Sequence, residues 1–272
     1  MKKQLDLSKV PCMILCGGKG TRLRDVSELL PKPMVSIGEQ PIVWHIMKSY
    51  AAFGVRNFIL CLGYKKEAFI DYFMNYHLRT ADVTIKLGHE PELIFHGNTP
   101  ESDWQVTLAN TGLEAGTGAR VKKASKYLSD KNKHFFLTYG DGVANVDIAA
   151  LYAHHLKGGK LLTISAVHPE ARFGGMLLDG NNVRGFEEKP PKADGYINGG
   201  YMVVDRDFIE LYLNDDDTLF FERAPMEQCA KDGQMQVYKH EGYWQCMDNQ
   251  REFLLLNKLW DGGNPPWTKY WK

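Results

Sequence analysis

Apolar and polar positions follow two different periods along the first two-thirds of the chain. Short apolar runs predict buried strands, and apolar positions three or four residues apart predict amphipathic helices. Strands are expected at residues 11–16, 57–62, 83–87, 134–139 and 161–167. Helices are expected at residues 42–53, 65–75, 118–128 and 148–156. Because strands and helices alternate, the pattern predicts an α/β fold, a mainly parallel sheet with helices on both faces.

After residue 173 the apolar runs become shorter and turn signals lie closer together, as at residues 179–182 and 192–195. This part is expected to be a smaller, β-rich, substrate-binding portion. A helix is expected at residues 251–259, and a tail with Pro265, Pro266, Trp267 and Trp271 follows. We expect these aromatic side chains to pack on the body or on another subunit. The prediction is one domain (1–272) with a nucleotide-binding core (11–170), a sugar-phosphate-binding portion (171–248) and a C-terminal helix and tail (249–272).

Composition narrows the functional class. The chain has 272 residues, 44% of them apolar, and equal numbers (33) of basic and acidic residues. No overall basic field favours nucleic acid or an anionic membrane, so a small-molecule partner is expected. Five cysteines without a C-x-x-C pair indicate reduced core thiols. No apolar run approaches the roughly 20 residues of a membrane span, and the first ten residues are too polar for a signal peptide, so a cytoplasmic location is expected.

The strongest chemical signal is a glycine-rich turn, GGKGTRL at residues 17–23, followed by a Pro-flanked Lys32. Backbone N–H groups in such a turn converge on an anion, and the side chains of Arg22 and Lys32 can clamp it. A P-loop requires Lys and then Ser or Thr after the last glycine, and a dinucleotide fingerprint requires Gly or Ala where Leu23 stands. Both fail. A turn that only joins a strand to a helix needs neither cation.

Two acidic residues are candidate magnesium ligands. Asp141 follows the strand at residues 134–139 in a Gly-Asp-Gly sequence, and Asp248 follows an aromatic strand at residues 243–247. Magnesium is usually held by one or two carboxylates together with nucleotide phosphates. The alternatives are that Asp141 shapes a turn and that Asp248 caps a helix starting near Asn249. A Cys/His zinc site is disfavoured, because no ligand pair has the required spacing.

The third cluster is Phe186-Glu187-Glu188-Lys189-Pro190, followed by Asn198-Gly199-Gly200. A lysine here can meet the phosphate of a sugar phosphate, and a neighbouring carboxylate can accept hydrogen bonds from sugar hydroxyls.

Taken in order, these motifs resemble those of the sugar-1-phosphate nucleotidylyltransferases over residues 11–267. The sequences WHIM at 44–47, TGAR at 117–120, RFG at 172–174 and YWQ at 243–245 resemble the cytidylyltransferase branch. Ala119 replaces a Gly and Cys246 a Pro of that branch. The resemblance implies a Rossmann-like fold of the nucleotide-diphospho-sugar transferase type, and the reaction of CTP with α-D-glucose 1-phosphate to give CDP-glucose and pyrophosphate. It also implies a role in dideoxysugar or lipopolysaccharide O-antigen synthesis, and a homo-oligomer, a hexamer or trimer.

Site residues are assigned as follows. In the expected Mg²⁺-assisted in-line attack, Arg22 grips the β- and γ-phosphates, Lys32 steadies the α-phosphate, and Lys189 brings in the sugar phosphate. The expected nucleotide-binding residues are Leu15, Gly17, Gly18, Gly20, Thr21, Arg22, Lys32, Thr117, Gly118, Arg120 and Asp141. The expected substrate-binding residues are Tyr139, Gly174, Glu188, Lys189, Asn198, Gly200 and Trp244. The expected metal ligands are Asp141 and Asp248.

Three alternatives stay open. The same chemistry could use dTTP, UTP or another phosphorylated acceptor, because base choice depends on a few polar contacts. The chain could be a catalytically silent nucleotide-sugar binder. Against this, it retains all five charged residues of the expected site, which are Arg22, Lys32, Asp141, Lys189 and Asp248. A nicotinamide oxidoreductase is disfavoured by the glycine spacing. In addition, the polar, turn-rich segment 90–103 is hypothesised to be a lid that orders when nucleotide binds.

Overall fold

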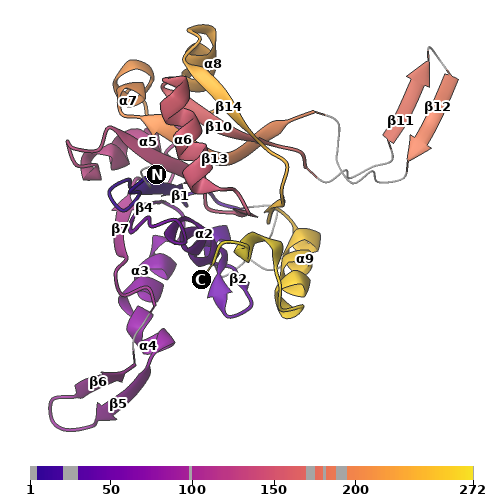
Figure 1. The fold of residues 1–272 in the computed structure, drawn as a ribbon. Helices are drawn as coiled ribbons and strands as arrows, with labels where there is room; N and C mark the ends of the chain where they lie inside the picture. Colours follow the sequence, from indigo (N-terminus) through magenta and orange to yellow (C-terminus); the bar gives the residue numbers. More distant parts are fainter. Residues whose placement is uncertain are drawn as a thin grey trace.

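A seven-stranded sheet forms the centre of the computed structural model, which describes residues 5–20, 30–97, 100–169, 175–179, 182–187 and 195–271 (Figure 1). Six strands run in one direction and β13 runs against them. Across the sheet the strands are β14 (Met235–His240), β10 (Leu162–Val167), β13 (Ile197–Asp205), β8 (His134–Tyr139), β1 (Cys12–Leu15), β4 (Asn57–Leu62) and β7 (Gln105–Asn110). The predicted mainly parallel sheet is therefore confirmed.

Helices cover both faces of this sheet. The hydrophobic core on one face includes residues of α2 (Ile42–Ala51), α3 (Lys66–Met74), α6 (Ile148–Gly158) and α9 (Gln250–Asp261). The core on the other face includes residues of α5 (Thr117–Ala124), α7 (Asp207–Tyr212) and α8 (Ala224–Lys231). The short helices α7 and α8 were not expected, whereas the other five confirm the predicted positions.

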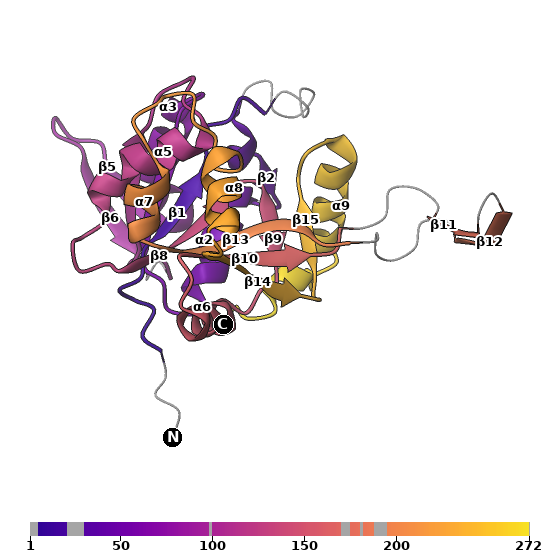
Figure 2. The same cartoon turned by 90° about the horizontal axis from the view of Figure 1, so that it is seen from above.

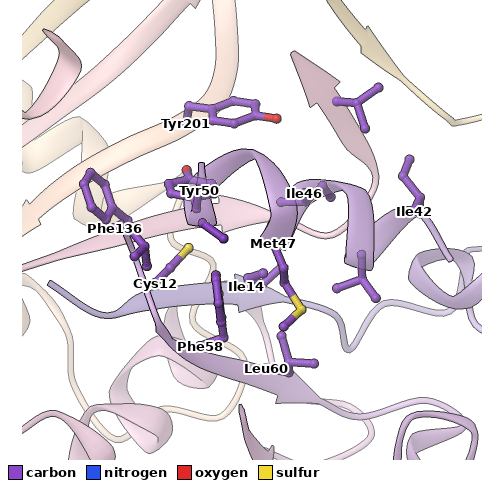
Figure 3. Close-up of a cluster of buried hydrophobic side chains, with 14 of the residues drawn as sticks. Cys12, Ile14, Ile42, Ile46, Met47, Tyr50, Phe58, Leu60, Phe136 and Tyr201 are labelled. Carbon is purple, nitrogen blue, oxygen red and sulfur yellow. The ribbon is translucent and has the colours of Figure 1, made fainter. Parts of the chain in front are cut away.

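The strand β1 shows why its continuous apolar sequence is buried on both sides. Cys12 and Ile14 belong to the core under α2, and Met13 and Leu15 belong to the core of the opposite face. Figure 3 shows Cys12 and Ile14 on the side of the strand that faces α2, with Cys12 near Tyr50 and Ile14 near Met47 of that helix. Alternate side chains of a strand point to opposite faces, so a strand covered on both sides must be apolar throughout.

The described residues form four two-stranded ribbons in addition to the sheet. They are β2 (Ser36–Ile37) with β3 (Gln40–Pro41), β5 (Asp82–Lys86) with β6 (Glu92–His96), β9 (Gly142–Ala144) with β15 (Trp244–Cys246), and β11 (Gly175–Asp179) with β12 (Asn182–Glu187). The remaining short elements are α4 (Tyr76–Thr80), η2 (Lys32–Met34), η3 (Ser125–Tyr127) and η4 (Pro266–Thr268). In Figures 1 and 2 the β5–β6 and β11–β12 hairpins project from the body.

One predicted sheet strand is wrong. Residues 83–87 were expected in the central sheet, but β5 pairs only with β6 among the described residues, and the neighbour of β4 is β7. The reason lies in burial, because β5 alternates polar and apolar residues and is exposed along most of its length. The proposed lid at 90–103 contains β6, so it is not turn-rich throughout, and its ordering by nucleotide stays a prediction.

The C-terminal tail packs on the body of the protein, which was one of the two expected positions, the other being a second subunit. Trp267 is 1% exposed, and its Nε1 donates to Nδ1 of His45 at 3.3 Å. His45 Nε2 lies 2.9 Å from the carbonyl oxygen of Ile37, and burial lowers the pKa of His45 to about 4. The indole N–H can only donate and the carbonyl can only accept, so His45 is neutral with its hydrogen on Nε2.

All five cysteines are free thiols, as expected. None of the helices in the described ranges is long and apolar enough to cross a membrane. Strands β13 and β14, which follow residue 171, belong to the large sheet, and the division of the chain at residues 170 and 248 stays a proposal.

Candidate active site

A cavity of about 250 Å³ opens at the carboxyl ends of β1 and β8. These strands are parallel neighbours, with Leu15 opposite Tyr139, so the glycine turn after β1 and the Gly140-Asp141 turn after β8 lie on the same edge. The cavity is lined by Leu15, Cys16, Gly17, Gly18, Gly20, Lys32, Pro33, Ala115, Thr117, Arg120, Tyr139, Gly140, Asp141 and Phe220. Nine predicted site residues are therefore together at this position.

Arg120 holds the glycine turn in place. Its side chain is buried, and the acceptors that it contacts in the described part of the chain are neutral oxygens. These acceptors are the carbonyl oxygens of Leu62, Gly112, Gly17 and Leu113 and the Thr111 hydroxyl, at 2.7–3.2 Å. A side chain at Gly17 would overlap the guanidinium, which explains the glycine there. The five contacts commit Arg120 to the protein, and its expected contact with nucleotide stays a prediction.

Lys32 lies on the other side of the cavity and contacts two carboxylates. Its Nζ is 3.1 Å from Oδ2 of Asp141 and 2.5 Å from Oδ1 of Asp248. Burial alone would lower the pKa of Lys32, but the two carboxylates outweigh burial and raise that pKa above its usual value. The ammonium group is thus charged, and only 10% of the Lys32 side chain is exposed.

Pairing of β9 with β15 brings the two acids together from distant parts of the chain. Gly142 lies opposite Cys246, and the Met247 N–H donates to the carbonyl oxygen of Asp141 at 2.8 Å. Asp248 follows directly. The alternative that Asp248 caps the next helix is wrong, because the N-cap of α9 is Asn249, whose side chain accepts from the Glu252 N–H.

Among the described residues, predicted substrate-binding residues lie near Tyr139 and the neighbouring strand β13. Asn198 Nδ2 donates to the Tyr139 hydroxyl at 3.3 Å, and Trp244 Nε1 donates to the Gly199 carbonyl at 2.8 Å. Gly200 has φ +78°, and a side chain there would overlap the Tyr139 ring. The glycine is therefore required both by its backbone angle and by the close approach of Tyr139.

Beyond the other cavity-lining residues that were not predicted, Glu222 contacts two of the predicted ones. Glu222 accepts from the Tyr139 hydroxyl at 2.7 Å and from the Thr117 hydroxyl at 2.5 Å. Gly118, predicted to bind nucleotide, donates its N–H to Leu219 at 2.9 Å. Nothing in the spacing of the chain signals that residues 217–222, far from Thr117 in sequence, form this wall of the site.

Five predicted site residues lie outside the described residues, so the structure does not place them. They are Thr21, Arg22, Gly174, Glu188 and Lys189.

The carboxylate pair suits a divalent cation. Within the described ranges there is no group of three or more His, Cys, Asp or Glu side chains that could hold a metal. Asp141 and Asp248 nevertheless converge on one cationic atom, Nζ of Lys32. Two hard carboxylates completed by nucleotide phosphates are the donor set that Mg²⁺ prefers, so the residues present fit this ion.

A mainly parallel sheet with a glycine turn and a charged cluster at one edge defines an α/β protein that binds phosphorylated ligands at its strand ends. The model of the family described as nucleotidyl transferase matches residues 12–257, and the chain belongs to this family.

Several of the similar proteins are named as sugar-phosphate nucleotidyltransferases, and two with the name cytidylyltransferase cover nearly the whole chain. The glucose-1-phosphate cytidylyltransferase of Salmonella typhi is 41% identical over 260 residues, 96% of this chain and 99% of its own. A protein of Bacillus subtilis named probable glucose-1-phosphate cytidylyltransferase is 38% identical over 95% of this chain and 99% of its own. The structure of HddC from Yersinia pseudotuberculosis superposes with a TM-score of 0.66 at 24% identity, covering 92% of this chain and 99% of that one. That likeness supports the fold.

Proposed function

We propose that this chain transfers a cytidylyl group from CTP to α-D-glucose 1-phosphate, giving CDP-glucose and pyrophosphate. The observation that carries the proposal is the convergence of Lys32, Asp141 and Asp248 beside the glycine turn. The 41% identity with the Salmonella typhi glucose-1-phosphate cytidylyltransferase supports this choice of substrates.

Catalysis of this reaction depends mainly on positioning the two substrates and on neutralising the charge of their phosphates. The attacking oxygen of a sugar phosphate is already anionic near neutral pH, so the enzyme needs no strong general base. The backbone N–H groups of the turn after β1 would bind nucleotide phosphate, and Lys32 would stabilise the charge that develops at the α-phosphate. Lys32 is suited to this, since its raised pKa keeps it charged.

Magnesium is part of the proposal. Asp141 and Asp248 would hold it, and when bound it would neutralise phosphate charge and align the in-line displacement. Among residues that the structure does not place, Arg22 would bind the β- and γ-phosphates, Lys189 the sugar phosphate and Glu188 the sugar hydroxyls. These roles rest on the motifs alone.

The assay is pyrophosphate release with Mg²⁺ and glucose 1-phosphate, comparing CTP, dTTP, UTP, ATP and GTP. Preference for CTP is the expected result. Preference for dTTP or UTP would keep the chemistry and overturn the base assignment, and no release with any nucleotide would favour the silent nucleotide-sugar binder. A folded Asp141→Asn protein with an undiminished rate would contradict the metal assignment.

We also propose that the chain works as a homo-oligomer, a hexamer or trimer, in dideoxysugar or O-antigen synthesis. The support is the resemblance to the family. Light scattering of the purified protein tests the assembly, and a monomer over the concentration range of the assay would overturn it.

A further inference from the structure

Residues 217–222 form a wall of the nucleotide cavity by docking onto the start of α5. The carbonyl of Asp217 accepts from the Gly116 N–H at 2.8 Å, and the carbonyl of Leu219 accepts from the Gly118 N–H at 2.9 Å. A side chain at Gly116 would overlap the Leu219 carbonyl, so glycine is needed for this approach. Phe220, which lines the cavity, belongs to the same segment. The wall is thus a built feature of the fold.

The Thr117 hydroxyl has a fixed direction in this wall. The Phe221 N–H can only donate, so Thr117 Oγ1 accepts from it, at 2.9 Å. An ionised carboxylate can only accept, so the single hydroxyl hydrogen of Thr117 is donated to Glu222 Oε2, at 2.5 Å. Among the described residues one lone pair of Thr117 Oγ1 is then left without a donor, and Thr117 lines the cavity. Toward a ligand this hydroxyl is an acceptor.

Tyr139 repeats the arrangement on the other oxygen of Glu222. Its hydroxyl donates to Oε1 at 2.7 Å and accepts from Asn198 at 3.3 Å. Burial, and then the neighbouring Glu222 carboxylate, raise the pKa of Tyr139 well above its usual value, so this hydroxyl keeps its hydrogen. Both hydroxyl hydrogens are therefore directed to one carboxylate.

We propose that Glu222 is a specificity-determining positioning residue: by taking the only hydrogen of Thr117, it leaves an acceptor at the cavity wall that selects a base bearing an amino group. The inference rests on the proposed function. Cytosine carries an amino donor at the ring position where uracil and thymine carry a carbonyl acceptor. A pyrimidine with the carbonyl would set two acceptors against each other, and such a mismatch is costly inside a site.

The test compares the ratio of kcat/KM for CTP to that for UTP across matched variants. In Glu222→Gln the amide can donate to Thr117, whose own hydrogen is then free to turn toward the cavity. The ratio is expected to fall about tenfold, through KM and through the Kd values of the two nucleotides measured by calorimetry, with kcat for CTP little changed. Thr117→Val should lower the ratio similarly, and Thr117→Ser, which keeps the hydroxyl, should restore it.

The control is Glu210→Gln, the same chemical change at a carboxylate that is 71% exposed on α7, and it should leave the ratio unaltered. If Glu222→Gln lowers kcat/KM for both nucleotides equally, Glu222 is only structural and the inference is wrong. Should that variant fail to fold, equal ratios in Thr117→Val and Thr117→Ser would overturn it. Wild-type protein without preference for CTP would refute the proposed function, whereas preference for CTP that no variant alters would refute only the role of Glu222.

Discussion

Two cationic side chains line the same cavity, and they are bound in opposite ways. Among the described residues, Arg120 donates to neutral oxygens, four of them backbone carbonyls at the end of β4 and in the loops after β1 and β7. Lys32 contacts two carboxylates that are themselves 33% and 23% exposed. The first arrangement ties the loops together. The second holds a charge between groups that can exchange partners.

The difference shows how to tell a structural cation from a reactive one at the same site. Carbonyl oxygens deprived of a buried donor have no replacement, so removing Arg120 leaves several unsatisfied groups. In the proposed mechanism Asp141 and Asp248 instead take a divalent ion, which would release Lys32 toward phosphate. Charge on the acceptors, more than burial of the cation, separates the two roles.

The largest effect is expected for Lys32→Met. The variant should stay folded, since the lysine ties no backbone groups, and kcat should fall on the order of 10²- to 10³-fold because charge at the α-phosphate is no longer stabilised. Steady-state pyrophosphate release measures this. Lys86→Met, at a 59% exposed lysine of the β5–β6 hairpin, is the control and should retain its rate. An equal effect in both variants would remove Lys32 from the chemistry.

Arg120→Lys should act on stability. Lysine cannot reproduce the planar fork that reaches all five acceptors, so we expect a loss of about 3 kcal/mol in the free energy of unfolding. Urea denaturation measures it. A variant as stable as the wild type but unable to bind CTP would reverse the comparison and make Arg120 a ligand-binding residue.

His45 is a third buried basic side chain, and unlike Arg120 and Lys32 it is uncharged at neutral pH. Its pKa of about 4 lies below that of the unfolded chain, near 6.5, so the unfolded state binds the proton first as pH falls. Stability should therefore be lost between pH 6.5 and 4, by roughly 3 kcal/mol for this group, and not further below pH 4. His134 and His155, whose pKa values burial also lowers, add to the total. In thermal melts, the melting temperature of His45→Gln should depend less on pH than that of the wild type. An unchanged pH dependence would assign the effect to His134 and His155.

The smallest and sharpest test uses two neighbouring glycines. An alanine at Gly17 would push against Arg120, whereas an alanine at Gly18 meets nothing within 4 Å. Gly17→Ala should cost about 2 kcal/mol of stability. Gly18→Ala should melt like the wild type and yet raise the KM for CTP, because its methyl group enters the cavity where phosphate approaches the backbone. Equal melting points for the two variants would show that the loop adapts.

Local patterns predicted β1, β4 and β8 and the acids and glycines at their ends, because buried parallel strands have continuous apolar sequences and ligands bind at their carboxyl ends. The strand β7 was not predicted. Its one neighbour among the described strands is β4, and a strand at the edge of a sheet keeps polar residues such as Gln105 and Asn110. Glu222 was not predicted as a site residue for another reason. Its role arises from the docking of two segments about a hundred residues apart, which no local period encodes.

The contact between Trp267 and His45 sets a condition on how the molecule can be made. The two residues are 222 positions apart in the chain, and α2 is sealed by a tail that is synthesised more than two hundred residues later. During translation the part of α2 that Trp267 covers stays exposed until residue 267 has left the ribosome. A nascent chain halted before that point presents an open face of its core to chaperones and to other chains.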